Sequence, residues 1–300
     1  MVEWLALLIV VPAVVVPVVL LAGFAGCDQF FGIDELDFPI LSAEATSTSD
    51  IVLTWLYGDR HPQTYNFERT ELPDGDPVPF NVSLSPYMDH DLKPDTEYQY
   101  HVRASYHDGS ASDWSSYVSA RTLPFRTSFE WKSYEEAFSR DAQGWAGSCI
   151  VQRIEAVRLS TSGTKVKITL RASSAGDASI ARVYISRPDP DPTKTLYDPD
   201  ADLTAVATTP FVVAANTSLT LPPVEYALDE GQPLLIAVDF SATPASAIRV
   251  SDHALGAPDH VPPEEALTYF KIATEAAAMP DRTGFDSTAG FNLIYKIEVA

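Results

Sequence analysis

The stretch LKPDTEYQYHVRASYHDGSASDWSSYVSARTLP, residues 92–124, decides how the first half of the chain folds. Apolar and polar side chains alternate through YQYHVRASY, residues 98–106. One face of this segment would carry Tyr98, Tyr100, Val102 and Ala104, and the other Gln99, His101, Arg103 and Ser105. A period of two predicts a half-buried antiparallel strand. The Asp108–Gly109 pair then predicts a hairpin turn, and residues 114–122 predict the returning strand.

The same stretch resembles the second half of a fibronectin type III domain. That family carries a Leu-x-Pro-x-Thr-x-Tyr corner, which Leu92, Pro94, Thr96 and Tyr98 match position by position. Trp55, in the alternating run IVLTWL, matches the core tryptophan of the family's second strand. The resemblance covers residues 39–123 and implies a β-sandwich in which the corner tyrosine bonds to nearby backbone. Domains of this family serve as spacers or binding platforms, so the fold alone does not imply a function.

Residues 148–300 predict a second, larger β-sandwich. Nine short strand-like runs follow one another there, with turn residues between them and no long segment of helical period. This pattern favours antiparallel sheets and an all-β chain. Residues 234–240 are apolar on both faces, as expected of a central strand. The arrangement resembles the jelly-roll accessory domains of carbohydrate-active enzymes and of phage tail and gene-transfer-agent proteins, which implies a recognition role.

Residues 124–147 are expected to connect the two sandwiches. Within them, residues 133–141 predict a short helix, because Ser133 and Glu136 have the spacing of a capping box.

Residues 1–27 are expected to hold the protein in place. From residue 4 to residue 26 the chain carries no charge, and this length suffices to cross a bilayer. The end of the run, LAGFAGC, resembles a bacterial lipoprotein signal, which implies lipidation of Cys27. The run departs from that pattern because its only early charged side chain is Glu3, and a signal peptide opens with basic residues. A cleaved lipoprotein signal, an uncleaved membrane anchor and a plug buried in a larger assembly all remain open; residues 28–38 then form a linker.

The charge balance limits the partners. The formal net charge is −21 and the isoelectric point is near 4.5. Such a surface repels phosphate backbones, which argues against nucleic acid as a partner. It also repels anionic lipid heads, so contact with a membrane or with other subunits is expected through residues 4–26. Cys27 and Cys149 lie in unlike contexts and predict no disulfide, and Cys149 is expected to be a small buried side chain.

Two groups of residues are candidates for ligand binding. The first has the D-x-D-x-D spacing of calcium loops, without the glycine and terminal glutamate of an EF-hand, and comprises Asp198, Asp200 and Asp202. The alternative for it is a solvated loop stiffened by proline. The second is a possible aromatic platform for sugar rings, comprising Trp131, Trp145, Tyr197 and Tyr269. The alternative for these aromatic residues is packing in the core or between domains.

The sequence contains no recognisable catalytic set. The G-x-S-x-G elbow, the H-E-x-x-H motif and a glycine-rich phosphate loop are absent, and His61, His90, His101 and His107 are scattered over different elements. We therefore expect no enzyme, no catalytic residue and no cofactor other than calcium. The expected function is that of an anchored display protein, foremost a phage-type virion tail or spike component that binds a host surface glycan or receptor. A bacterial surface lipoprotein adhesin, an accessory module of a glycan-active enzyme and a purely structural cement are the alternatives, and each places the chain in a virion or a cell envelope.

Overall fold

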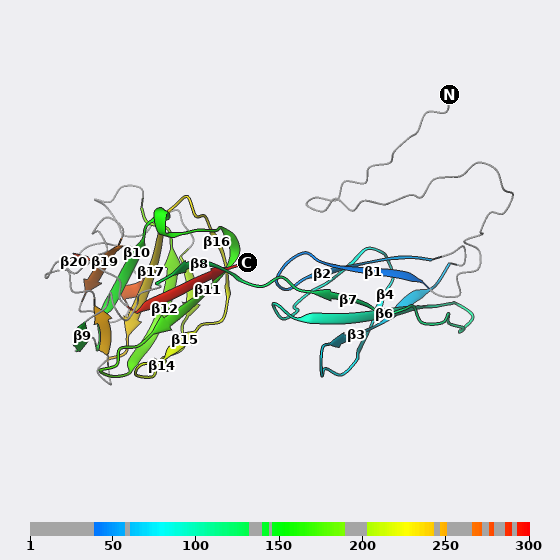
Figure 1. The fold of residues 1–300 in the computed structure, drawn as a ribbon, viewed down its shortest axis with the longest axis horizontal. Helices are drawn as coiled ribbons and strands as arrows, with labels where there is room; N and C mark the ends of the chain where they lie inside the picture. The colour runs from blue at the N-terminus through cyan, green and yellow to red at the C-terminus, as the bar shows by residue number, and fades with distance from the viewer. Residues whose placement is uncertain are drawn as a thin grey trace, which may run out of the picture.

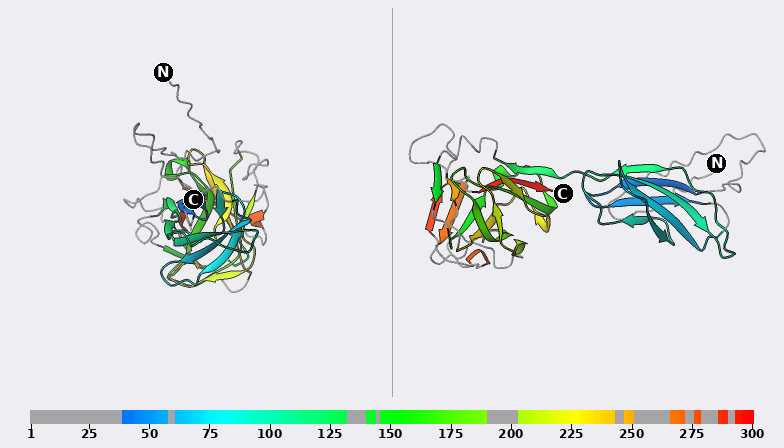
Figure 2. Two further views of the ribbon diagram at one scale, coloured as in Figure 1. Left: turned by 90° about the vertical axis from the view of Figure 1, so that its right-hand side faces the viewer. Right: turned by 90° about the horizontal axis from the view of Figure 1, so that it is seen from below.

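The computed structural model describes residues 39–57, 61–131, 140–143, 146–189, 203–242, 247–250, 266–271, 276–278, 286–289 and 293–300. They form two antiparallel β-sandwiches that lie end to end and are joined by residues 122–125 (Figure 1; Figure 2). The prediction of an all-β chain is confirmed. No helix within the described ranges is long and apolar enough to cross a bilayer.

The first sandwich is fibronectin type III-like. Its three-stranded sheet has the order β1-β2-β5, and its four-stranded sheet has the order β4-β3-β6-β7. The strands are β1 (Ile40–Ala45), β2 (Ile51–Leu56), β3 (Thr64–Glu71), β4 (Val78–Val82), β5 (Tyr87–Asp89), β6 (Glu97–Ser105) and β7 (Val118–Arg121). The predicted strand over residues 98–106 is β6, which pairs with β3 on one side and β7 on the other.

Alternating apolar side chains build the core of this sandwich. Ile51, Leu53 and Trp55 of β2 point inward and are buried, as are Tyr98, Tyr100 and Val102 of β6. The Trp55 ring meets Phe67 edge to face, with 4.9 Å between ring centroids. Both the core position of Trp55 and the inward face of β6 follow the sequence pattern.

The predicted corner lies where the chain enters β6. The Tyr98 hydroxyl accepts a 2.9 Å hydrogen bond from the backbone N–H of Lys93, as the family resemblance implies. The Thr96 hydroxyl donates to the Pro94 carbonyl at 2.9 Å, and the Leu92 side chain is buried beneath. The corner therefore ties the start of β6 to the turn before it.

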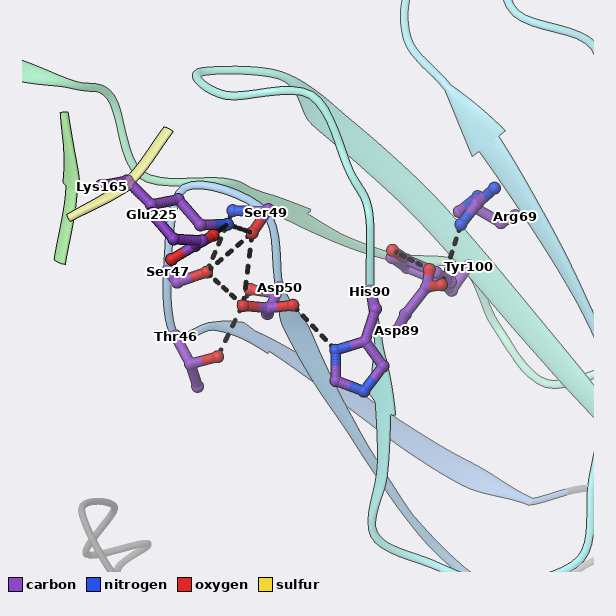
Figure 3. Close-up of polar contacts among 10 residues, drawn as sticks. All are labelled: Thr46, Ser47, Ser49, Asp50, Arg69, Asp89, His90, Tyr100, Lys165 and Glu225. Atoms are coloured by element: carbon purple, nitrogen blue, oxygen red, sulfur yellow. Dashed lines mark hydrogen bonds and ion pairs between the residues drawn. The ribbon is translucent and has the colours of Figure 1, made fainter. Parts of the chain in front are cut away.

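A buried carboxylate links the two sheets. Asp89 of β5 accepts a 2.8 Å hydrogen bond from the hydroxyl of Tyr100 on β6. The guanidinium of Arg69 on β3 forms an ion pair with the other oxygen of Asp89, also at 2.8 Å (Figure 3). A carboxylate removed from water is tolerated only when its oxygens have such partners. Burial, together with the neighbouring Asp89 charge, raises the pKa of the Tyr100 hydroxyl far above its usual value, so it remains a donor.

The second sandwich packs two larger antiparallel sheets around one core. One sheet has the order β13-β12-β17-β10-β19-β20, with β14 also paired to β12, and the other has the order β15-β11-β21-β8, with β16 paired to β11. A separate pair joins β9 and β18. The strands are β8 (Arg126–Glu130), β9 (Arg140–Gln143), β10 (Cys149–Ile154), β11 (Gly163–Arg171), β12 (Ala178–Ser186), β13 (Thr204–Ala207), β14 (Phe211–Val213), β15 (Ser218–Thr220), β16 (Val224–Leu228), β17 (Leu234–Phe240), β18 (Ala247–Val250), β19 (Ala266–Lys271), β20 (Asp286–Ala289) and β21 (Ile294–Val299).

Proline explains two of the breaks between successive strands. Pro210 lies between β13 and β14, and Pro222 and Pro223 lie between β15 and β16. Proline has no N–H to donate to a neighbouring strand, so the pairing stops at these positions. The predicted central strand is β17, which is buried at every position and paired with both β10 and β12.

The boundary of the second sandwich differs from the prediction. Residues 124–147 were expected to be a bridge, but β8 pairs with β21 and so belongs to the second sandwich, which begins at Arg126. The physical reason is that Phe129 is buried in that core, which draws the segment into the sheet. Most of the expected helix, residues 132–139, lies outside the described residues, and its last two positions, Arg140 and Asp141, belong to strand β9.

The Asp89 link yields a prediction about stability. Tyr100→Phe removes the hydroxyl donor and leaves one oxygen of a buried carboxylate unpaired, so we expect the free energy of unfolding of the first sandwich to fall by about 1–3 kcal/mol. Urea unfolding of the full chain, followed by hydrogen exchange of peptides from β5 and β6, measures this change. Tyr117→Phe, which removes an exposed hydroxyl, is the matched control and should stay within about 0.5 kcal/mol of the parent. Equal stability of both variants would contradict the role given to Tyr100.

Candidate functional site

Most of the residues predicted to bind ligands lie outside the described part of the chain. This is true of the calcium candidates Asp198, Asp200 and Asp202, of the platform residues Trp145 and Tyr197, and of Cys27. Tyr269 lies in strand β19, where the structure describes the backbone and not the side chain. Within the described ranges, no group of three or more His, Cys, Asp or Glu side chains is arranged to hold a metal ion.

Trp131 does not belong to an exposed aromatic platform. Its backbone N–H donates to the carbonyl of Tyr295 at 3.0 Å, which continues the pairing of β8 with β21 by one residue. The side chain is 6% exposed and packs in the core of the second sandwich. The guanidinium of Arg158 lies 5.5 Å from the ring centroid. The prediction that Trp131 stacks on a sugar is therefore wrong, and the packing alternative holds for this residue.

Cys149 is buried, as predicted. It lies on the face of β10 that points away from the main core, in a small cluster with Val151, Leu235 and Ala237. Burial raises the pKa of the Cys149 thiol far above its usual range, and the neighbouring Asp239 adds to this effect. Because the thiolate is the reactive form, this thiol is suited to packing and not to nucleophilic chemistry.

The first sandwich carries an aromatic column on its solvent face. We use this name for Arg103, Trp114, His101 and Tyr117, which stack in that order. The Arg103 guanidinium lies 4.6 Å from the centroid of the Trp114 ring. The imidazole of His101 is parallel to the Trp114 ring at 4.0 Å and to the Tyr117 ring at 4.3 Å, with interplanar angles of 14° and 17°. Tyr117 is 57% exposed, so the column reaches the surface.

Backbone pairing positions both halves of the column. His101 and Arg103 are outward residues of β6, because the alternating positions Tyr100 and Val102 are committed to the core. The connection from β6 to β7 then runs back along β6. Its Ser112 and Ser115 hydroxyls accept hydrogen bonds from the N–H groups of Ala104 and Val102, at 2.9 and 3.0 Å. This places Trp114, between the two serines, over the outward face of the strand.

A hydrogen-bond contact with an acidic side chain supports the centre of the column. His101 Nε2 lies 2.9 Å from Glu68 Oε2, and Glu68 is the residue directly opposite His101 on β3. The imidazole is thus held by stacking on both faces and by hydrogen bonding at its edge. Four side chains are fixed relative to one another before any partner binds, which lowers the conformational entropy that binding would cost.

No sequence motif predicts this column. His101 is one of several scattered histidines, and Trp114 and Tyr117 fall in the predicted returning strand. The signal that could have indicated it is a pair of spacings. His101 and Arg103 are two residues apart on the outward face of one strand, and Trp114 and Tyr117, after the hairpin, are three residues apart.

The junction between the sandwiches forms a second polar cluster (Figure 3). Lys165 of β11 donates from Nζ to the Ser49 hydroxyl at 2.9 Å, and the same Nζ lies 3.4 Å from Glu225 of β16. Ser49 belongs to the loop of residues 46–50 between β1 and β2. Asp50, at the end of that loop, accepts a hydrogen bond from Ser47 and lies 2.9 Å from Nδ1 of His90.

Several contacts hold the cluster in place. The N–H of Leu123 donates to the Ser47 carbonyl at 3.0 Å, so the interdomain stretch is attached to the loop. On the other side, Gly163 lets the last residue of the chain approach β11. A Cβ atom at Gly163 would lie 2.6 Å from the carbonyl oxygen of Ala300. Lys165 is therefore anchored at its backbone by the paired Ala300, and its side chain reaches the first sandwich.

The junction lowers the pKa of one carboxyl group, that of Asp50. Burial alone would raise the pKa of the Asp50 carboxyl, but the hydrogen bonds from Ser47 and His90 and the charges of His90 and Lys165 outweigh that effect and hold the pKa below its ordinary value of 3.8. The cluster therefore favours the charged form of Asp50.

Comparisons with known proteins give structural likenesses only. No protein-family model matches the chain, and no curated protein matches it. The chain is similar to a myokine structure, with 21% identity, 29% of this chain and 96% of that one covered, and a TM-score of 0.26. It is similar to the FN5 domain of Drosophila Lar, with 23% identity, 28% and 91% covered, and a TM-score of 0.24. A segment of two fibronectin type III domains from chicken tenascin shares 10% identity, with 86% and 99% covered and a TM-score of 0.26.

The lowered pKa of Asp50 predicts a pH-dependent stability. A carboxyl with a depressed folded pKa contributes stability above its unfolded pKa and loses that contribution as the pH falls through the folded value. We expect Asp50→Asn to lower the free energy of unfolding at neutral pH by less than about 1 kcal/mol, because the contacts are partly exposed. The difference from the parent should shrink as the pH falls below 3.8 and vanish once Asp50 is protonated in the folded state as well.

Urea unfolding of parent and variant at neutral and acidic pH measures this effect. Asp113→Asn is the control, since Asp113 is an exposed acid in the connection between β6 and β7, and it should match the parent throughout. A difference for Asp50→Asn that persists unchanged into strong acid would contradict the assignment.

Proposed function

We propose that this chain is a non-catalytic, anchored recognition protein that presents the aromatic column of its first sandwich to a glycan or receptor on a host surface. The observation that supports the proposal is the column itself, with Tyr117 exposed at its end. Tyrosine, tryptophan and arginine are the side chains that most often dominate binding energy at interfaces. Aromatic side chains also present ring faces and edges that suit the C–H groups of sugars.

The charge distribution supports a partner that is neutral or basic. The net charge of −21 opposes nucleic acid and anionic surfaces. Within the column, His101 is paired with the acidic Glu68, and Arg103 faces a ring. The column therefore presents apolar and hydrogen-bonding groups more than net positive charge, which fits a neutral glycan or a protein surface.

The proposed setting is a phage-type virion, in which residues 4–26 hold the chain in a tail or spike. The two sandwiches lie end to end, which suits a component that extends from its attachment point (Figure 1). The charge-free run at residues 4–26 suits burial among the subunits of an assembly. The alternative setting is a bacterial surface lipoprotein adhesin, which Cys27 after a small-residue pair favours.

Binding by the column is open to a direct test. We expect Tyr117→Ala in the full chain to weaken binding on a glycan array by about tenfold, the loss typical of an interface residue worth more than 1 kcal/mol. Tyr117→Phe, which keeps the ring, should retain most of the signal. Val157→Ala removes an exposed apolar side chain from the second sandwich and serves as the matched control. Absence of binding by the parent with and without calcium, or equal binding by Tyr117→Ala, would contradict the proposal.

The two settings predict different masses of the mature protein. In a virion, the intact mass should begin at residue 1 or 2, because an assembly plug is not removed. In a lipoprotein, the mass should begin at a diacylated Cys27, because the preceding residues are cleaved. Intact mass spectrometry of protein from its native source separates the two outcomes.

A further inference from the structure

An apolar patch lies at the end of the first sandwich where the chain enters it. We use this name for Ile40, Leu56 and Leu84, which are 51%, 69% and 78% exposed. Ile40 and Leu56 are directly opposite each other on β1 and β2. The Trp55 N–H donates to the Ser85 hydroxyl at 3.0 Å, which holds Leu84 beside the end of β2. Three large, exposed apolar side chains are thus held at the same end of this sheet.

The rest of the same sheet face is polar. Beyond Ile40 and Leu56, the next outward pair along β1 and β2 is Ser42 and Thr54, and the Ser42 hydroxyl donates to the Thr54 carbonyl. Glu44 follows on β1. Single exposed apolar residues are common, whereas three at one end of an otherwise polar face make a candidate contact surface.

The place where the chain enters the sandwich brings one segment next to the patch. Pro39 is buried and directly precedes Ile40, so the chain still lies against the sandwich when it reaches the patch. Proline lacks an N–H and cannot extend the pairing of β1. The chain therefore leaves the sheet beside Ile40, and the segment immediately before it is the linker of residues 28–38, DQFFGIDELDF.

The composition of the linker matches the patch. Its large apolar side chains are Phe30, Phe31, Ile33, Leu36 and Phe38, and its acids are Asp28, Asp34, Glu35 and Asp37. Linkers that stay free in water are rich in small and polar residues and poor in aromatic ones. Two adjacent phenylalanines are therefore unusual for such a linker. Phe31 is nine residues from Ile40, a reach of up to about 30 Å in extended chain, so the distance to Leu56 or Leu84 does not limit contact.

We propose that Phe30 and Phe31 of the linker dock on the apolar patch. The covalent tether gives the linker an effective concentration that no independent partner at ordinary concentration matches. The four acids of the linker disfavour the two rival occupants, since they repel a second copy of this acidic chain and an anionic lipid surface. Burial of the phenylalanine rings against three aliphatic side chains supplies the driving force.

Docking has a consequence for the direction of the first sandwich. A free linker lets the sandwich point anywhere within its reach, whereas a docked linker fixes the start of β1 relative to residues 1–27. The loop of residues 46–50, at the other end of β1, contacts the second sandwich through Lys165. Linker docking thus orients the first sandwich, with its aromatic column, relative to the anchor.

The rate at which a thiol reagent labels the patch tests the docking. Leu56→Cys is made in the full chain, and maleimide labelling of that peptide is followed by mass spectrometry, which separates it from Cys27 and from the buried Cys149. If the linker is docked nine-tenths of the time, labelling slows about tenfold relative to Val157→Cys, an exposed position on the second sandwich. Adding Phe30→Ser and Phe31→Ser should raise the rate at position 56 by the same factor and leave the rate at position 157 unchanged. Ile40→Cys provides a second patch position with the same expectation.

Three results would overturn the docking. Equal labelling of positions 56 and 157 would show that the patch is open. Slow labelling that persists in the Phe30→Ser and Phe31→Ser variant would show that something other than the linker covers the patch. Protection that disappears on dilution would assign the patch to a second copy of the chain.

Discussion

The buried carboxylate of Asp89 is the constraint on which the first sandwich depends. It joins β5 in one sheet to β3 and β6 in the other through Arg69 and Tyr100. Tyr100 can reach Asp89 only if β6 turns its tyrosines inward, and strand geometry then forces His101 and Arg103 outward. The interior ion pair and the exterior aromatic column are therefore two results of the same strand orientation. A shift of β6 by one residue would bury Arg103 without a partner, expose Tyr100 and dismantle the column.

Local patterns in the sequence predict the first sandwich well, because its signals are short-range. The alternation over residues 98–106 and the Leu-x-Pro-x-Thr-x-Tyr corner each involve residues that are close together in the sequence. The strand and the corner that they predict are formed by those same residues. The second sandwich is predictable as strands but not at its boundary. β8 is placed by β21, at the far end of the chain, and no local pattern in residues 126–131 indicates a partner so distant. The burial of Trp131 is hidden for the same reason, because it follows from the pairing with Tyr295 near the end of the chain.

The candidate site shows a similar limit. The column requires β6, its connection to β7 and the serine hydrogen bonds that fold this connection back, so that Trp114 and Tyr117 stand on either side of His101. Each residue type taken alone has a common structural explanation. Only the pairing of the strand with the segment after it shows that the four side chains form one surface. Motif searches for catalytic or metal sites do not detect such a surface. Those sites need particular residues at fixed spacings in the sequence, and stacked side chains do not.

The two ends of the first sandwich are held by different kinds of force. The end facing the second sandwich is polar, and its contacts among Lys165, Ser49 and Glu225 are partly exposed. Such contacts contribute about 0–1 kcal/mol each and weaken with salt. The other end is the apolar patch, where burial contributes about 25 cal/mol for every Å² removed from water and is not screened by salt. If the linker occupies the patch, the stiffer attachment lies between the anchor and the first sandwich. The second sandwich is then the more mobile part, and the recognition surface proposed for the first sandwich keeps a defined direction relative to the proposed anchor.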